Sequence, residues 1–113
     1  MLDKTVLWYT GSYKKRYHTD EWLTHYPGLN KEATEWLANQ GIVNFGIDAP
    51  SVDNPTDKMF PCHVVCREKK LLNMENLANL DKVSGKRFIF IGFPLKIRGA
   101  SGSSIRAVAL LKA

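Results

Sequence analysis

The sequence has no long hydrophobic run. No segment comes near the roughly eighteen consecutive apolar residues of a membrane-spanning helix, and Met1–Lys4 does not lead into the hydrophobic stretch of a signal peptide. The Gly-x-Ser-x-Gly motif of serine hydrolases, the Walker loop and the Gly-x-Gly-x-x-Gly loop are also absent from it. We therefore expect neither membrane insertion nor export, and these hydrolase and nucleotide-binding classes are not indicated.

Cysteine is scarce, with only Cys62 and Cys66 in the chain. Four residues apart in a predicted helix, the two side chains share a face, but a straight helical turn rarely gives the converging Cβ vectors of a disulfide. We expect two free thiols, which indicates a reducing compartment and a cytoplasmic location.

The composition is that of a folded domain. Apolar residues make up 44% of the 113 residues and charged residues 24%, with eight glycines and five prolines. These values exclude disordered, collagen-like and coiled-coil classes. The length is sufficient for one core, so residues 1–113 are expected to form a single domain. A net charge of +5 permits attraction to phosphates but does not require it.

The order of the predicted elements indicates an α/β fold. Asn30 has the residue type of an N-cap, and Ala33, Trp36 and Leu37 form one apolar stripe of the helix that follows. A second helix over 62–69 follows Pro61, a residue favoured in the first turn. Because helices alternate with strands, we predict βαβ crossovers with parallel strands, and a last strand that returns antiparallel. The segment 13–20 is expected to be a loop. The prediction is a mixed sheet of about five strands, over 5–9, 42–47, 71–74, 87–93 and 105–111.

Candidate functional residues lie where the predicted parallel strands end, because ligands of open α/β sheets bind at that edge. The first strand ends at Thr10, and the second ends at Asp48, with Ser51 and Asp53 after it. Thr10, Asp48 and Ser51 are the candidates for substrate contact at this edge.

His63 and Glu75 are the candidates for metal binding. His63 starts the helix that leaves this edge, and Glu75 ends the third strand, so the two side chains are expected to approach each other. Imidazole and carboxylate are both ligands of Zn²⁺, Mn²⁺ and Fe²⁺. The alternative is a hydrogen-bonded pair without a metal. Cys62, His63 and Cys66 do not form a plausible cluster, because adjacent helical positions point about 100° apart.

A basic and aromatic segment over 13–18 suggests a different function. Tyrosines interleaved with lysine and arginine can stack on bases and neutralise phosphates of single-stranded nucleic acid. No nucleic-acid-binding module accompanies the segment, so a solvated loop is favoured and no nucleic-acid partner is predicted.

Several blocks of the sequence resemble one family. Leu7–Gly11 is similar to the strand and Thr-Gly turn of the cyclase family of metal-dependent hydrolases, the family of bacterial kynurenine formamidase and isatin hydrolase. Six further blocks occur in family-like order and spacing, namely 27–29, 33–37, 46–53, 75–80, 94–97 and 106–107.

The resemblance implies a swivelling β/β/α-type fold and a metal-dependent hydrolase that acts on small-molecule amides, as in tryptophan catabolism. It implies a divalent metal, Zn or Mn, in intact members. The histidine before the family's Glu-Asn-Leu motif and the glutamate of that motif correspond here to His63 and Glu75, the pair that the strand ends also indicate.

One part of the family pattern is missing. The motif His-x-Gly-Thr-His-x-Asp-x-Pro-x-His, which carries most metal ligands and the acid/base histidine, does not occur in these 113 residues. The usual Gly-Asp-Gly-Ser-Pro turn is altered over 99–104. The chain therefore resembles the C-terminal half of a family member. We expect weak or absent metal binding and no activity of the chain alone; the alternative is a non-catalytic paralogue that binds a partner.

Apolar side chains that an N-terminal half would cover are expected to be exposed. The candidates are Leu7, Phe88, Phe90 and Phe93. An uncovered apolar patch of more than a few hundred Å² favours self-association or a partner chain.

Overall fold

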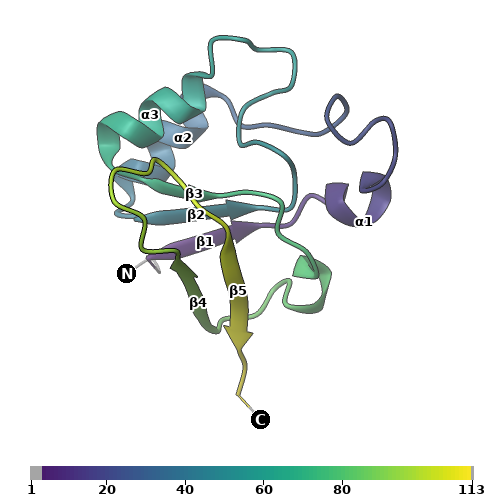
Figure 1. Ribbon diagram of the computed structural model, residues 1–113, viewed down its shortest axis with the longest axis vertical. Coiled ribbons are helices and arrows are strands. Elements are labelled where there is room, and N and C mark those ends of the chain that lie inside the picture. The colour runs from purple at the N-terminus through teal and green to yellow at the C-terminus, as the bar shows by residue number, and fades with distance from the viewer. Residues whose placement is uncertain (1–3, 113) are drawn as a thin grey trace. The chain divides into compact units, whose positions relative to one another are not determined.

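The computed structural model describes residues 4–112 and divides into two compact units, Met1–Lys82 and Val83–Ala113 (Figure 1). The single domain over 1–113 stays a prediction. The described helices include none that is both long and apolar enough to cross a membrane.

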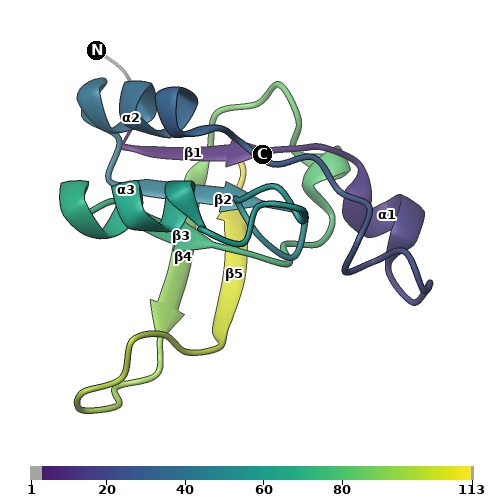
Figure 2. The same cartoon turned by 90° about the horizontal axis from the view of Figure 1, so that it is seen from above.

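The first unit is built on a parallel three-stranded sheet. Its strands are β1 (Thr5–Trp8), β2 (Asn44–Ile47) and β3 (Leu72–Met74), in the order β1-β2-β3. The crossovers run through α2 (Lys31–Asn39) and α3 (Pro61–Lys69), which pack together on one face of the sheet (Figures 1 and 2). The predicted βαβ crossovers are confirmed, and all three parallel strands end at the same edge.

The ends of the two crossover helices follow from local sequence. Asn30 caps α2, because its side-chain Oδ1 accepts the backbone N–H of Ala33 at 2.9 Å. Pro61 is in the first turn of α3, but the N-cap residue Phe60 is left-handed, with φ 52°, and provides no side-chain cap. The first N–H groups of α3 have no acceptor within the helix, so they must donate to a group from another part of the chain.

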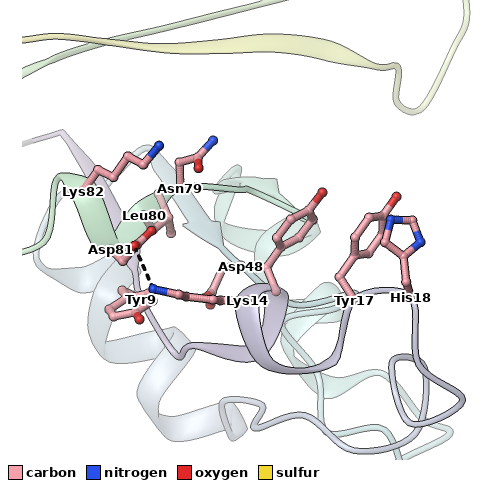
Figure 3. A pocket seen from close by; sticks show the side chains of 10 residues that line it. Tyr9, Lys14, Tyr17, His18, Asp48, Asn79, Leu80, Asp81 and Lys82 are labelled. Carbon is pink, nitrogen blue, oxygen red and sulfur yellow. Dashed lines mark hydrogen bonds and ion pairs between the residues drawn. The ribbon is translucent and has the colours of Figure 1, made fainter.

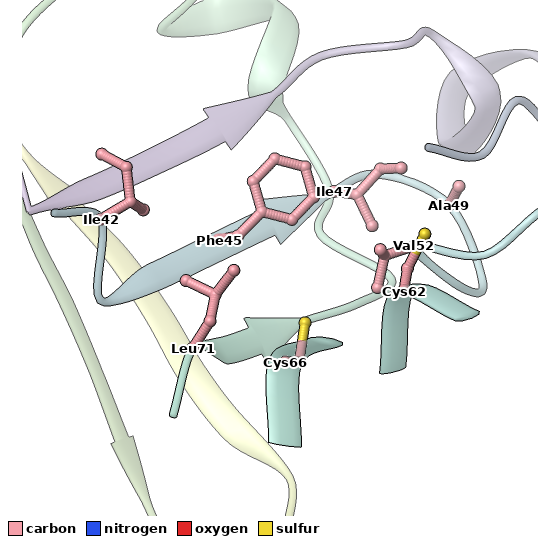
Figure 4. Close-up of a cluster of buried hydrophobic side chains, with 8 residues drawn as sticks. All are labelled: Ile42, Phe45, Ile47, Ala49, Val52, Cys62, Cys66 and Leu71. Atoms are coloured by element: carbon pink, nitrogen blue, oxygen red, sulfur yellow. The ribbon is translucent and has the colours of Figure 1, made fainter. Parts of the chain in front are cut away.

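The core lies between the sheet and the two helices (Figure 4). Ile47 and Val52 are fully buried, and Phe45 is 3% exposed. From α3, Cys62 and Cys66 point into the same cluster. Every buried hydrophobic residue of the described chain belongs to this first unit. The unit therefore has its own apolar core.

One short helix was not predicted. Residues Ser12–Arg16 form α1, so the expected loop over 13–20 is wrong there. The hydroxyl of Thr10 accepts the N–H of Ser12 at 3.1 Å, which starts the turn. The rings of Tyr13 and Tyr17 then stack at 4.4 Å, as neighbours four residues apart on a helix can. These two contacts stabilise a helix in a segment with little apolar periodicity.

The second unit is an antiparallel hairpin of β4 (Ile89–Pro94) and β5 (Ile105–Leu110). Its pairing places Ile89 opposite Leu110, so both lie on the same face, as Phe93 does. On this face Ile89 is 62%, Phe93 80% and Leu110 55% exposed. Of the other side chains expected to be uncovered, Leu7, Phe88 and Phe90 are partly buried.

The mixed α/β class is thus observed, but the strands lie in a sheet of three and a sheet of two. One sheet of five is not confirmed. The hydrogen bonds of β4 and β5 are made with each other, and their ladder extends over all six residues of each strand. The backbone N–H and C=O groups on the facing sides of β4 and β5 are therefore paired with each other, and neither strand pairs with β3.

Candidate functional site

The candidate site lies at the carboxyl edge of the parallel sheet. Asp48 follows β2 directly, and Glu75 follows β3 directly. The chain after Glu75 keeps close to β2, because the N–H of Asn76 donates to the carbonyl of Ala49 at 2.9 Å. The strand ends that the sequence predicted to meet are therefore neighbours.

His63 and Glu75 come together as the sequence predicts. His63 is in the first turn of α3, and its Nε2 lies 3.1 Å from Oε1 of Glu75. The amide of Asn73 donates to the same Oε1 at 3.0 Å. The His63 side chain is 40% exposed and that of Glu75 27%. The pair is thus ordered by protein contacts yet open to an ion or substrate.

Asp53 holds the other side of the imidazole. Its Oδ2 lies 2.6 Å from Nδ1 of His63 and accepts the backbone N–H of His63 at 3.1 Å, while its Oδ1 accepts the N–H of Cys62 at 2.6 Å. Asp53 is 1% exposed. The sequence placed Asp53 after the second strand but gave it no role. The sequence contains one signal for such a role: Asp53 is a carboxylate that lies shortly before a helix whose N-cap residue, Phe60, has no capping side chain.

The two carboxyl groups differ in their electrostatics. Burial raises the pKa of Asp53, but hydrogen bonds from His63 and Cys62 outweigh it, so the pKa lies below its ordinary value. Burial also raises the pKa of Glu75, and the contacts with His63 and Asn73 only partly oppose that effect. Asp53 is therefore a fixed anion, and Glu75 is the carboxyl group that gains more from a nearby positive charge.

The candidates for substrate contact form hydrogen bonds within the loops that carry them. Asp48 is 2% exposed, and its oxygens accept the N–H and hydroxyl of Thr10, at 2.8 and 2.6 Å, and the N–H of Gly11 at 2.8 Å. The hydroxyl of Ser51 accepts the N–H of Asp53 at 3.0 Å. These bonds fix the loops after β1 and β2. Contact of Thr10, Asp48 and Ser51 with a substrate stays a prediction.

A pocket of about 420 Å³ opens beside α1 (Figure 3). Asp48 lines it, together with aromatic and basic side chains, and Lys14 pairs with Asp81 across it at 3.5 Å. Tyr13 and Tyr17, which the sequence offered as stacking platforms for bases, stack on each other. Neither His63 nor Glu75 lines this pocket.

Both cysteines are free, as predicted, and both are buried. Burial raises the pKa of Cys62 to about 12 and that of Cys66 to about 11, from an ordinary 9.0. Because the thiolate is the reactive form, iodoacetamide at pH 8 is expected to label the folded chain about a hundredfold more slowly than the unfolded chain. Mass spectrometry over time measures both rates, and similar rates would contradict the prediction.

The same shifts predict a loss of stability in alkali. The unfolded thiols lose their protons first, so the unfolded chain binds fewer protons than the folded chain as the pH rises above 9.0. The free energy of unfolding is therefore expected to fall between about pH 9 and pH 12. Denaturation curves at fixed ionic strength check this, with Cys62→Ala and Cys66→Ala showing a smaller slope.

The fold is that of a known class of protein. The Cyclase family model matches residues 3–54. In structure, the chain superimposes on an isatin hydrolase bound to the product analogue thioisatinate with a TM-score of 0.86 and 32% identity, over 96% of this chain and 45% of that chain. The predicted resemblance to the cyclase family is confirmed by sequence and by fold.

Individual curated relatives share about a third of their aligned residues with this chain. Isatin hydrolase of Roseibium aggregatum is 36% identical over 98 residues, 83% of this chain and 37% of that protein. Kynurenine formamidase of Bordetella petrii is 33% identical over 89 residues, 79% of this chain and 42% of that protein. A potential metal-dependent hydrolase with cyclase activity has the same fold, with a TM-score of 0.67. The chain thus spans about two fifths of the length of the curated relatives it matches.

Proposed function

We propose that this chain carries part of the metal centre of a cyclase-family amide hydrolase, with His63 and Glu75 as two ligands. The observation that carries the proposal is the 3.1 Å separation of Nε2 and Oε1. Two ligand atoms each about 2.0 to 2.2 Å from one ion lie at comparable separations from each other. The imidazole–carboxylate set suits Zn²⁺ or Mn²⁺.

The residues present fit such an ion only in part. Within residues 4–112, no three side chains of histidine, cysteine, aspartate or glutamate are arranged to hold one metal ion. Asp53 does not add a ligand to this face, because its Oδ2 bonds Nδ1 on the other side of the imidazole. We therefore propose weak metal binding, with the remaining positions filled by water or by the family's histidine motif.

In a complete centre the metal would polarise an amide carbonyl and activate water. The part of this chain is to present Nε2 of His63 and Oε1 of Glu75 in fixed positions. Asn73 holds the glutamate from the strand side. We propose a small-molecule amide as the substrate, as the names of the isatin hydrolase and kynurenine formamidase relatives suggest. The proposed location is the cytoplasm.

Titration with Mn²⁺ or Zn²⁺, followed by NMR of the imidazole signals, tests this proposal. Mn²⁺ is expected to broaden the signals of His63 and leave those of His25, an exposed histidine bonded to Thr24, unchanged. His63→Ala and Glu75→Gln should each abolish the saturable response to Zn²⁺, whereas His25→Ala should not. Equal binding by all the variants would overturn the proposal.

The second candidate is a non-catalytic interaction module. It is favoured by the exposed apolar face of the hairpin, where Phe93 is 80% exposed. Such a face is suited to self-association or to a partner chain. Restoration of hydrolysis by an added histidine-motif segment, described in the Discussion, would favour the first candidate over this one.

A further inference from the structure

We infer that Asp53 is the positioning residue of the candidate metal centre: it holds Nδ1 of His63 so that only Nε2 faces Glu75. The inference rests on the proposed function, since it assigns a role toward the metal that His63 and Glu75 would bind. Asp53 itself lies on the far side of the imidazole from Glu75 and is not proposed as a ligand.

The two nitrogens of His63 have different partners. Nδ1 lies 2.6 Å from Asp53 and Nε2 lies 3.1 Å from Glu75. Both partners are carboxylates, and only a nitrogen without a proton can bind an ion. With an ion bound at Nε2, the ring therefore keeps its proton on Nδ1 and donates it to Asp53. Nε2 is then the nitrogen whose lone pair is available to an ion. A carboxylate behind the ring also increases the basicity of the ligating nitrogen.

Asp53 fixes the helix that carries His63 as well as the ring. Pro61 has no N–H, and the next two N–H groups of α3, from Cys62 and His63, both donate to Asp53. The carboxylate thus replaces the missing N-cap side chain at Phe60 from a position seven residues earlier in the chain. Movement of Asp53 would therefore shift the start of α3 and the imidazole together.

Asp53 is itself held by the core. It is 1% exposed, and Ser51 accepts its backbone N–H at 3.0 Å. The segment before it pairs with the entry to α2, because the N–H of Leu29 donates to the carbonyl of Val52 at 2.8 Å. The carboxylate is therefore fixed before any ion arrives, as expected of a group that orients a ligand.

Asparagine is a sharp test of this arrangement. Both oxygens of Asp53 accept hydrogen bonds, from Cys62 on one side and from His63 on the other. The amide of Asp53→Asn has one accepting atom and one donating NH₂ group, so either orientation places the NH₂ group against a backbone N–H, that of Cys62 or that of His63. The variant retains the size of the side chain and loses only the double acceptor and the charge.

The first measurement needs no substitution. In metal-free protein, long-range ¹H–¹⁵N NMR should show a proton on Nδ1 of His63, and Zn²⁺ should shift Nε2 while Nδ1 keeps its proton. A Zn²⁺-dependent loss of the Nδ1 proton, with Nδ1 as the coordinating nitrogen, would overturn the inference even if no Asp53 variant folds.

The second measurement compares Zn²⁺ affinities. Asp53→Asn is expected to weaken binding 10- to 100-fold, the usual effect of removing a carboxylate behind a histidine ligand. Asp57→Asn is the matched control in the same loop: its Oδ1 accepts the N–H of Met59 at 3.0 Å, and the variant should bind Zn²⁺ as the wild type does.

The outcomes separate the two proposals. If His63→Ala and Glu75→Gln bind Zn²⁺ as the wild type does, the metal centre is wrong. If these two variants lose binding and a folded Asp53→Asn variant retains wild-type affinity, the metal centre stands and the positioning role of Asp53 is wrong. Weakened binding by Asp53→Asn, with the Asp57→Asn control unchanged, supports both proposals.

Discussion

The chain alone is expected to hydrolyse neither isatin nor N-formylkynurenine above the background rate, even with Zn²⁺ or Mn²⁺ added. The proposed site has only two protein ligands, His63 and Glu75, so an ion there would be coordinated mostly by water and bound weakly. The sequence also lacks the family's histidine motif, and a positioned acid/base group contributes about 10² to 10⁴ in rate. The combined loss is expected to remove detectable turnover.

Absorbance assays of both substrates measure this result. A separately prepared N-terminal segment that bears the family's histidine motif is the complementing partner. Mixing is expected to restore activity when the chain is wild type and not when it carries His63→Ala. Turnover by the chain alone that is lost in both His63→Ala and Glu75→Gln would show that the chain holds a complete site.

Gly28→Ala is expected to destabilise the chain and to displace Asp53. A Cβ at Gly28 would lie 2.3 Å from the backbone nitrogen of Asn54 and 2.5 Å from the carbonyl carbon of Asp53. Backbone atoms cannot rotate away, so the loop that holds Asp53 must move. Forcing atoms into a well-packed position costs about 1–3 kcal/mol, and here the cost falls on the segment that orients His63.

Urea denaturation followed by circular dichroism measures the free energy of unfolding, and the Zn²⁺ titration measures the effect on the site. Gly102→Ala is the matched control, because a Cβ at Gly102 would have no atom within 4 Å and the φ of this glycine is not in the left-handed region. The control should be neutral in both measurements. Unchanged Zn²⁺ affinity in a destabilised Gly28→Ala variant would show that the loop yields without moving Asp53.

Much of the fold could be predicted because its signals are local. The cap at Asn30 and Pro61 in the first turn of α3 mark helix starts that the structure confirms. The short helix α1 was missed, because its sequence has little apolar periodicity and the turn before it is held by bonds from Thr10 and Gly11 to the distant Asp48. The division into two sheets depends on the pairing partners of β4, which strand propensity does not specify.

The candidate site was partly predictable for a related reason. Parallel strands end at one edge, so His63 and Glu75 could be placed together from the order of elements alone. Asp53 could not be assigned, because its contact with His63 depends on how the segment 54–62 between them turns back at the left-handed Phe60. The positions of the strand ends predict which residues lie next to each other across the sheet, but they do not predict the path of a loop.

The division of the chain into two units affects how its unfolding is observed. All three tryptophans, Trp8, Trp22 and Trp36, belong to Met1–Lys82, as do the buried residues of the described chain. Indole fluorescence therefore reports on the sheet unit, whereas the peptide signal in the far ultraviolet sums that unit and the hairpin. If the hairpin opens first, the two optical signals will have different midpoints although the sheet unit itself unfolds in a single step.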